Sequence, residues 1–224
     1  DGYVSGIPYR KVSIYTEGAL IAFIVDMFIM PPHGNTKSLD DVMRTLYHSY
    51  ALQGKPYSET DYWNIIEQTA GQACNHIFDN YVNKAASFDE PLKEALQYIG
   101  LAMQASPAKK HCERYWGMKV TEEDNKYKIT AVIPGAPAEQ AGICVNDEIA
   151  LLNEHSLKGN FHDWCAYYGN EEVKMTLVSQ SFRRYVTVKP ISGKEFFPSY
   201  FVVKLKNATP EQKAAYKAWS RHNF

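Results

Sequence analysis

The sequence has no excess of charge of either sign, no long uninterrupted hydrophobic run and few cysteines. Its 224 residues include 24 Lys and Arg against 25 Asp and Glu, for a net charge of −1. This balance provides neither the basic patch of a nucleic-acid-binding protein nor an acidic disordered tail, so we expect no nucleic-acid partner. The sequence also contains no GxGxxG, no phosphate-binding loop and no nucleophile elbow, which argues against nucleotide-binding and serine-hydrolase functions.

The four cysteines do not form a recognisable metal or redox motif. No two of them are spaced as CxxC, which disfavours a zinc ribbon or a thioredoxin-type site. Cysteines this sparse in a long chain are more typical of buried thiols than of a disulfide framework, and they leave the redox compartment open. They are Cys74, Cys112, Cys144 and Cys165.

The most apolar stretch is too short for a membrane span. It runs from Ala19 to Met30, is interrupted by Asp26, and is followed by Pro31 and Pro32. A transmembrane helix needs about 20 apolar residues, and consecutive prolines end a helix. We therefore predict a helix buried on most sides inside a soluble domain, and no membrane span.

Apolar periodicity divides the chain into two domains and a tail. Residues 1–104 show helical spacing, with cap signals at Ser38 and Ser58, and predict an all-helical bundle. Residues 105–111 are small and polar and predict a linker. Residues 112–193 alternate with a period of two around two short helices, and 194–224 predict a closing strand and helix. The predicted fold class is α+β.

One segment of the second domain resembles the centre of bacterial PDZ domains. It is PGAPAEQAGICVNDEIALLN, residues 134–153. The resemblance implies a PDZ-like, partly open β-barrel with two helices. It places the carboxylate-binding loop at Tyr115, Trp116, Gly117 and Met118, so that these residues and a helix at 161–168 would bind a peptide between them. Trp116 and Met118 could equally be core residues.

Three stretches of the helical half resemble the distal part of the glycyl aminopeptidase family of zinc metallopeptidases. They are VSIYTEGALIAFIVDMFI, SLDDVMRTLY and YSETDYWNIIEQTAG, and the closing TPEQKAAYKAW resembles the end of those chains. In that family a zinc domain precedes the helical region and a PDZ domain follows it. The resemblance implies that this chain is the C-terminal portion of such an enzyme, consistent with its start at Asp1 rather than Met.

The family's zinc motif HExxH does not occur in this sequence. We expect no metal ligands or cofactor in this chain, zinc in a missing upstream domain, and no activity of the chain alone. The family's YxKG pattern corresponds to Tyr15, Thr16, Glu17 and Gly18, and implies that the Tyr15 phenol stabilises an oxyanion. Glu17 stands where the family has lysine, and Ile14 stands where a second tyrosine often lies.

Two functions follow as alternatives. In the first, the parent protein is an aminopeptidase that hydrolyses peptides after small N-terminal residues, with peptide or protein substrates also held at the PDZ groove. In the second, the chain is a non-catalytic PDZ scaffold that binds peptides or proteins. Neither alternative distinguishes the bacterial cytoplasm from the periplasm.

Overall fold

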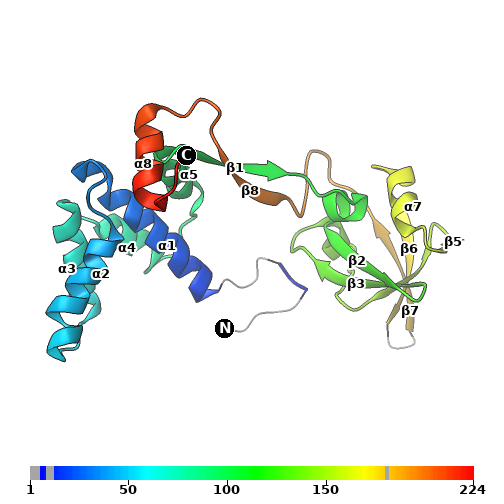
Figure 1. Cartoon of the computed structure of the whole chain (residues 1–224). Helices are drawn as coiled ribbons and strands as arrows, with labels where there is room; N and C mark the ends of the chain where they lie inside the picture. Colours follow the sequence, from blue (N-terminus) through cyan, green and yellow to red (C-terminus); the bar gives the residue numbers. More distant parts are fainter. Residues whose placement is uncertain (1–5, 9–12, 180–181) are drawn as a thin grey trace. The chain divides into compact units, whose positions relative to one another are not determined.

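The computed structural model describes residues 6–8, 13–179 and 182–224. Contacts between residues divide the chain into two compact units (Figure 1). The helical unit comprises Ile14–Gln104 and Val202–Phe224, and the sheet unit comprises Ala105–Phe201 with the segment before Ile14. Each unit therefore combines segments that are distant in the sequence, and each is considered separately below.

The helical unit contains the elements that apolar spacing predicts, and reciprocal caps fix where several of them begin. The Ser58 hydroxyl accepts from the Asp61 N–H, while the Asp61 carboxylate accepts from the Ser58 N–H at 2.8 Å. Capping boxes of this kind satisfy two of the amide donors left free at a helix start. The elements are α1 (Ile14–Ile29), η1 (Pro31–His33), α2 (Leu39–Ser49), η2 (Ala51–Gln53), α3 (Glu59–Ala70), α4 (Asn75–Tyr81), α5 (Asp89–Tyr98) and α8 (Pro210–Ser220).

Burial along the predicted stretch Ala19–Met30 is uneven, since Ala19 is exposed and the buried side chains lie from Ile24 onward. Ile24, Val25 and Ile29 pack in one cluster with α2, α3 and α4, and Met27 packs in another with α5 and α8. The first turn projects beyond these helices, and Ile14 there is 66% exposed. By length and composition alone, the stretch Ile14–His33 is long and apolar enough to cross a membrane. The protein buries 28% of its most apolar 18-residue window.

The sheet unit is built on an antiparallel sheet in the order β2-β3-β4-β6-β7, with β5 paired to β4 (Figure 1). Together with the helices it confirms the α+β class, but the sheet is open. Within the described residues β2 and β7 are the two ends of the strand order and are not paired with each other, so the sheet is not closed into a barrel. The elements are η3 (Cys112–Trp116), β2 (Met118–Glu123), β3 (Lys126–Val132), α6 (Pro137–Gln140), β4 (Glu148–Leu152), β5 (His155–Ser156), α7 (Phe161–Tyr168), β6 (Val173–Ser179) and β7 (Phe182–Val188).

The chain passes between the two units through β1 (Leu101–Ser106) and β8 (Ser199–Lys204), which pair with each other as a two-stranded sheet. The predicted closing strand, 200–205, corresponds to β8. Strand β1 was not predicted, and the predicted linker 105–111 begins inside it. Most side chains of β1 are exposed, so the strand lacks the alternation of apolar and polar residues that marks a half-buried strand.

The core of the sheet unit forms around large side chains from η3, β3 and α7. Trp116, Tyr127 and Phe161 are almost fully buried. The Tyr127 hydroxyl accepts from the Gly159 N–H at 2.6 Å and donates to Glu122 Oε1 at 3.3 Å, so its polar atom is satisfied. This core fixes η3 and α7 relative to the sheet, and these are the elements that bound the candidate site.

Candidate functional site

Tyr15 lies in the first turn of α1, and its side chain is 79% exposed. The neighbouring Ile14 and Thr16 are also exposed, whereas Glu17 is half-buried. The phenol is therefore available to a surface outside the helical unit. This placement is compatible with the role that the YxKG resemblance implies, and it does not by itself assign that role.

The predicted carboxylate-binding loop is a single π-helical turn, η3, that ends at Gly117. Gly117 has φ +68°, in the left-handed region that favours glycine, and its N–H donates to the Cys112 carbonyl. Its carbonyl accepts from the Ile133 N–H at 2.9 Å. A Cβ at this position would overlap the Cβ of Ala136 and press on the Phe196 ring. Both the backbone conformation and the packing therefore require glycine here.

The side chains of the predicted loop residues differ in exposure. Trp116 and Met118 are both 0% exposed and belong to the core, as the alternative interpretation of these residues expects. Tyr115 is only partly buried, with the His111 ring 4.7 Å away and the Arg114 guanidinium 5.0 Å from its ring centre. Of these side chains, Tyr115 is the one that remains accessible to a ligand.

Arg114, which could assist a peptide carboxylate, is already paired. Its guanidinium forms an ion pair with Glu195, and the hydrogen bond that it donates to that carboxylate raises the pKa of Arg114. Its carbonyl accepts from the Phe196 N–H at 2.8 Å. The Lys119 ammonium lies 4.8 Å from the Phe197 ring centre. The segment Glu195–Phe197 thus lies along η3 and the start of β2.

Strand β2 is an end strand, and one of its edges is unpaired within the described part of the chain. An open edge presents alternating N–H and C=O groups, to which an extended peptide can add as a further strand. Pairing between β2 and β3 shifts register between Lys119 and Val120, and such irregularities bend the strand locally. The unpaired edge of β2, with η3 before it, is the candidate peptide site.

Helix α7 carries an aromatic cluster that sequence reasoning did not single out. The Trp164 ring stacks on His155 at 4.9 Å and on Tyr168 at 5.8 Å, and Tyr167 is 77% exposed beside it. The Trp164 indole N–H is buried without a partner among the described residues. The aromatic density of FHDWCAYY was the available signal.

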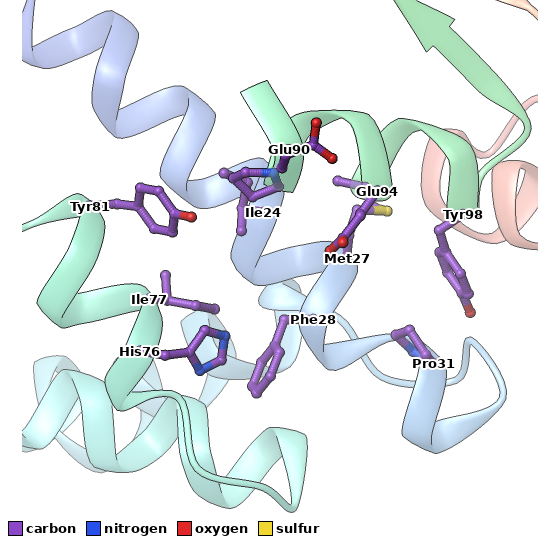
Figure 2. A pocket seen from close by; sticks show the side chains of 12 residues that line it. Ile24, Met27, Phe28, Pro31, His76, Ile77, Tyr81, Glu90, Glu94 and Tyr98 are labelled. Carbon is purple, nitrogen blue, oxygen red and sulfur yellow. The ribbon is translucent and has the colours of Figure 1, made fainter. Parts of the chain in front are cut away.

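The helical unit contains a cavity of about 400 Å³ between α1, α4 and α5 (Figure 2). Apolar side chains, including Phe28 and Ile77, form much of its wall, and the carboxylates of Glu90 and Glu94 lie at its α5 side. Both glutamates are exposed residues. Within the described residues there is no group of three or more His, Cys, Asp and Glu side chains that could hold a metal ion, so the described residues do not form a zinc site.

A family model for the PDZ domain matches residues 106–164. Across nearly its whole length, the chain is similar in structure to an aminopeptidase N family protein from Idiomarina loihiensis. The TM-score is 0.72 at 17% identity, and the match covers 95% of this chain and 37% of that protein. This chain thus spans little more than a third of that protein.

Two further solved structures match smaller parts of the chain. A serine endoprotease from Yersinia pestis matches with TM-score 0.30 and 23% identity, over 38% of this chain and 29% of that one. The PDZ domain of EpsC from Vibrio cholerae matches with TM-score 0.29 and 13% identity, over 46% of this chain and 97% of that one. No curated protein matches the chain. The chain therefore contains a PDZ domain at residues 106–164 and shares the fold of the Idiomarina loihiensis protein over 95% of its length.

Proposed function

We propose that this chain is the distal part of a zinc-dependent aminopeptidase that removes small N-terminal residues from peptides. The observation that carries the proposal is the match to an aminopeptidase N family protein, which extends through both units and covers 95% of the chain. The matched region therefore includes both the helical unit and the PDZ domain of this chain. The YxKG-like pattern at Tyr15 provides independent support.

In this proposal Tyr15 is the residue of the chain that touches the reacting atoms. A phenol with a pKa of about 10 is protonated at neutral pH and can donate a hydrogen bond. The exposed position of Tyr15 at the start of α1 leaves its hydroxyl free to meet an oxyanion on a neighbouring surface. One well-placed donor to a developing oxyanion contributes about 10²–10³-fold to kcat.

The metal would be bound by residues outside this chain. The described residues offer no group of three potential ligands, and the sequence contains no HExxH. In such an enzyme zinc supplies the activation of a water molecule. The contribution of this chain is the Tyr15 hydroxyl, the helical wall that carries it and the PDZ domain, so residues 1–224 alone are expected to be inactive.

The test is Tyr15→Phe in the complete gene product, assayed on glycyl and alanyl peptide substrates. We expect kcat to fall about 10²-fold with little change in KM, because the lost hydrogen bond forms in the transition state. Tyr47→Phe is a matched control, since Tyr47 is also an exposed tyrosine of the helical unit. An unchanged kcat in Tyr15→Phe would reject the assigned role.

A second candidate function is a non-catalytic scaffold that binds peptides at the PDZ domain. The open edge of β2 favours it, because backbone groups there can pair with a peptide strand. Fluorescent peptides with free and with amidated C-termini separate the possibilities. Binding that requires the free carboxylate, in a complete gene product without peptidase activity, would favour the scaffold over the aminopeptidase.

A further inference from the structure

Two buried cysteines meet between η3 and α7. Cys112 lies in η3 and Cys165 in α7, and both are 0% exposed. The Cys112 sulfur lies 3.8 Å from His162 Nδ1, and Cys112 and Cys165 belong to the same buried cluster. His162 and Cys165 are three residues apart on α7, a spacing that places side chains on the same face of a helix. Two thiols and an imidazole therefore converge at one point beneath the candidate peptide site.

The environment makes the two sulfurs chemically different. The hydrogen bond from Cys165, together with His162, lowers the pKa of Cys112 to about 6. Burial raises the pKa of Cys165. The thiolate is the reactive form of cysteine, so Cys112 is suited to attack an oxidant and Cys165 to remain a thiol beside it. By contrast, burial and Glu67 raise the pKa of Cys74, in the helical unit, to about 11.

We propose that Cys112 and Cys165 form an oxidation site that closes into a disulfide, with a hydroperoxide as the oxidant. The Cys112 thiolate attacks the terminal peroxide oxygen; an S–O bond forms, the O–O bond breaks, and the departing oxygen takes a proton from solvent. Cys165 then attacks the sulfur of the Cys112 sulfenic acid. The S–S bond forms, the S–O bond breaks, and the oxygen leaves as water with the Cys165 proton.

Because both sulfurs are 0% exposed, the oxidant reaches them during a local opening of the sheet unit. In the structure all four cysteines are free thiols. Cys144 is exposed, so it is replaced in the test below to keep its reactivity from obscuring that of the buried pair.

The disulfide would affect the candidate peptide site because of the elements that it joins. Cys112 is the first residue of η3, which is followed by Gly117 and β2, whereas Cys165 lies at the centre of α7. Covalent linkage fixes η3 against α7 and so restrains both elements next to the β2 edge. This regulatory consequence rests on the proposed peptide-binding function, whereas formation of the disulfide does not.

The test uses the full 224-residue chain with Cys74→Ser and Cys144→Ser, treated with hydrogen peroxide under native conditions. We expect the intact mass to fall by two hydrogen atoms and a non-reducing digest to contain the Cys112 peptide linked to the Cys165 peptide. The melting temperature of the sheet unit should rise by about 10 °C, as expected for a cross-link that closes a long loop. Reduction should restore the original mass, separate the two peptides and reverse the rise in melting temperature.

Two single variants separate the steps. With Cys165→Ser we expect a sulfenic acid at Cys112 that a dimedone probe traps, whereas Cys112→Ser should give no adduct at Cys165. Linkage that appears only after denaturant is added, or labelling of Cys165 before Cys112, would overturn the proposal. Both readouts are independent of peptide binding.

Peptide affinity of the reduced and oxidised chains then tests the regulatory role. We expect a change of several-fold, and linkage without any change in affinity would reject regulation while leaving the oxidation site established. If neither form binds a peptide with a free C-terminus, the proposed peptide-binding function fails and the regulatory role fails with it. The mass measurement decides the disulfide in every case.

Discussion

Replacing Gly117 by alanine tests the geometry of the candidate peptide site more sharply than any other single substitution. Gly117 has φ +68° and links η3 to β2, with Ala136 and Phe196 packed against its Cα. Forcing an L-residue into the left-handed region costs about 1–2 kcal/mol. Overpacking a filled site by one methyl group adds about 1–3 kcal/mol. We therefore expect Gly117→Ala to lower the free energy of unfolding of the sheet unit by about 2–5 kcal/mol.

Gly135→Ala separates the two contributions. Gly135 has φ +76°, and a Cβ there would meet no atom within 4 Å. Gly135→Ala should therefore lower the free energy of unfolding only by the cost of a left-handed backbone conformation, about 1–2 kcal/mol. The difference between the two variants measures the close approach of Ala136 and Phe196 to Gly117.

The assay is urea unfolding followed by tryptophan fluorescence. Trp63 and Trp219 lie in the helical unit, and Trp116 and Trp164 lie in the sheet unit. Because the two units need not unfold together, the fluorescence has to report on one unit at a time. Replacing Trp63 and Trp219 by phenylalanine restricts the fluorescence signal to the sheet unit. Equal destabilisation by Gly117→Ala and Gly135→Ala would refute the close packing described for the loop.

Two further predictions concern a buried carboxylate of the sheet unit and a half-buried carboxylate of the helical unit. Asp147 is 3% exposed, accepts a hydrogen bond from the Cys144 N–H at 2.7 Å and forms an ion pair with Arg184. Arg184→Ala should therefore lower the free energy of unfolding of the sheet unit by about 1–3 kcal/mol, the cost of leaving a buried polar group without its partner. In the same fluorescence assay the exposed neighbour Arg183, changed to alanine, should have little effect, and equal losses would contradict the role of the ion pair. In the helical unit, burial raises the pKa of Asp26 above 3.8, although its carboxylate accepts from the Leu39 N–H at 2.8 Å. The folded state then binds the Asp26 proton more tightly than the unfolded state, so this residue's contribution to stability falls as pH rises from 3.8 through the raised pKa. Asp26→Asn keeps an acceptor oxygen and should remove this pH-dependent contribution to stability. The variant should lose less stability than the parent chain as pH rises towards neutral, as measured by the fluorescence of Trp63 and Trp219. Parallel pH profiles for the two chains would contradict the raised pKa.

Much of the local structure could be predicted from the sequence because it depends on local chemistry. Ser38, Ser58 and Thr209 each begin a helix through a capping box, and the partner stands three residues later in the sequence. Helix α7 spans Phe161–Tyr168, the range that the PDZ resemblance implies. These features need no information about distant parts of the chain.

Features that depend on distant residues could not be predicted in this way. An apolar run does not reveal which of its residues other elements cover, so the uneven burial of Ala19–Met30, with Ala19 exposed and Ile24 buried, could not be predicted. Strand β1 pairs only with β8 and exposes most of its side chains, so its pattern carries no strand signal.

The candidate site shows the same division between local and distant information. The turn at Gly117 follows from a glycine in a recognisable segment, whereas Glu195, which pairs with Arg114, is distant in the sequence. Contact between Cys112 and Cys165 likewise depends on how η3 and α7 pack. The catalytic role of Tyr15 and the peptide-binding role of residues 115–118 remain predictions.

The central claim is that this chain completes a zinc aminopeptidase whose metal is bound elsewhere in the protein. The most direct measurement is the zinc content of the complete gene product and of residues 1–224 alone, together with hydrolysis of a glycyl or alanyl anilide by each. The account predicts stoichiometric zinc and chelator-sensitive turnover in the complete product, and neither in the shorter chain. A complete product without zinc and without turnover, or stoichiometric zinc in residues 1–224, would contradict it.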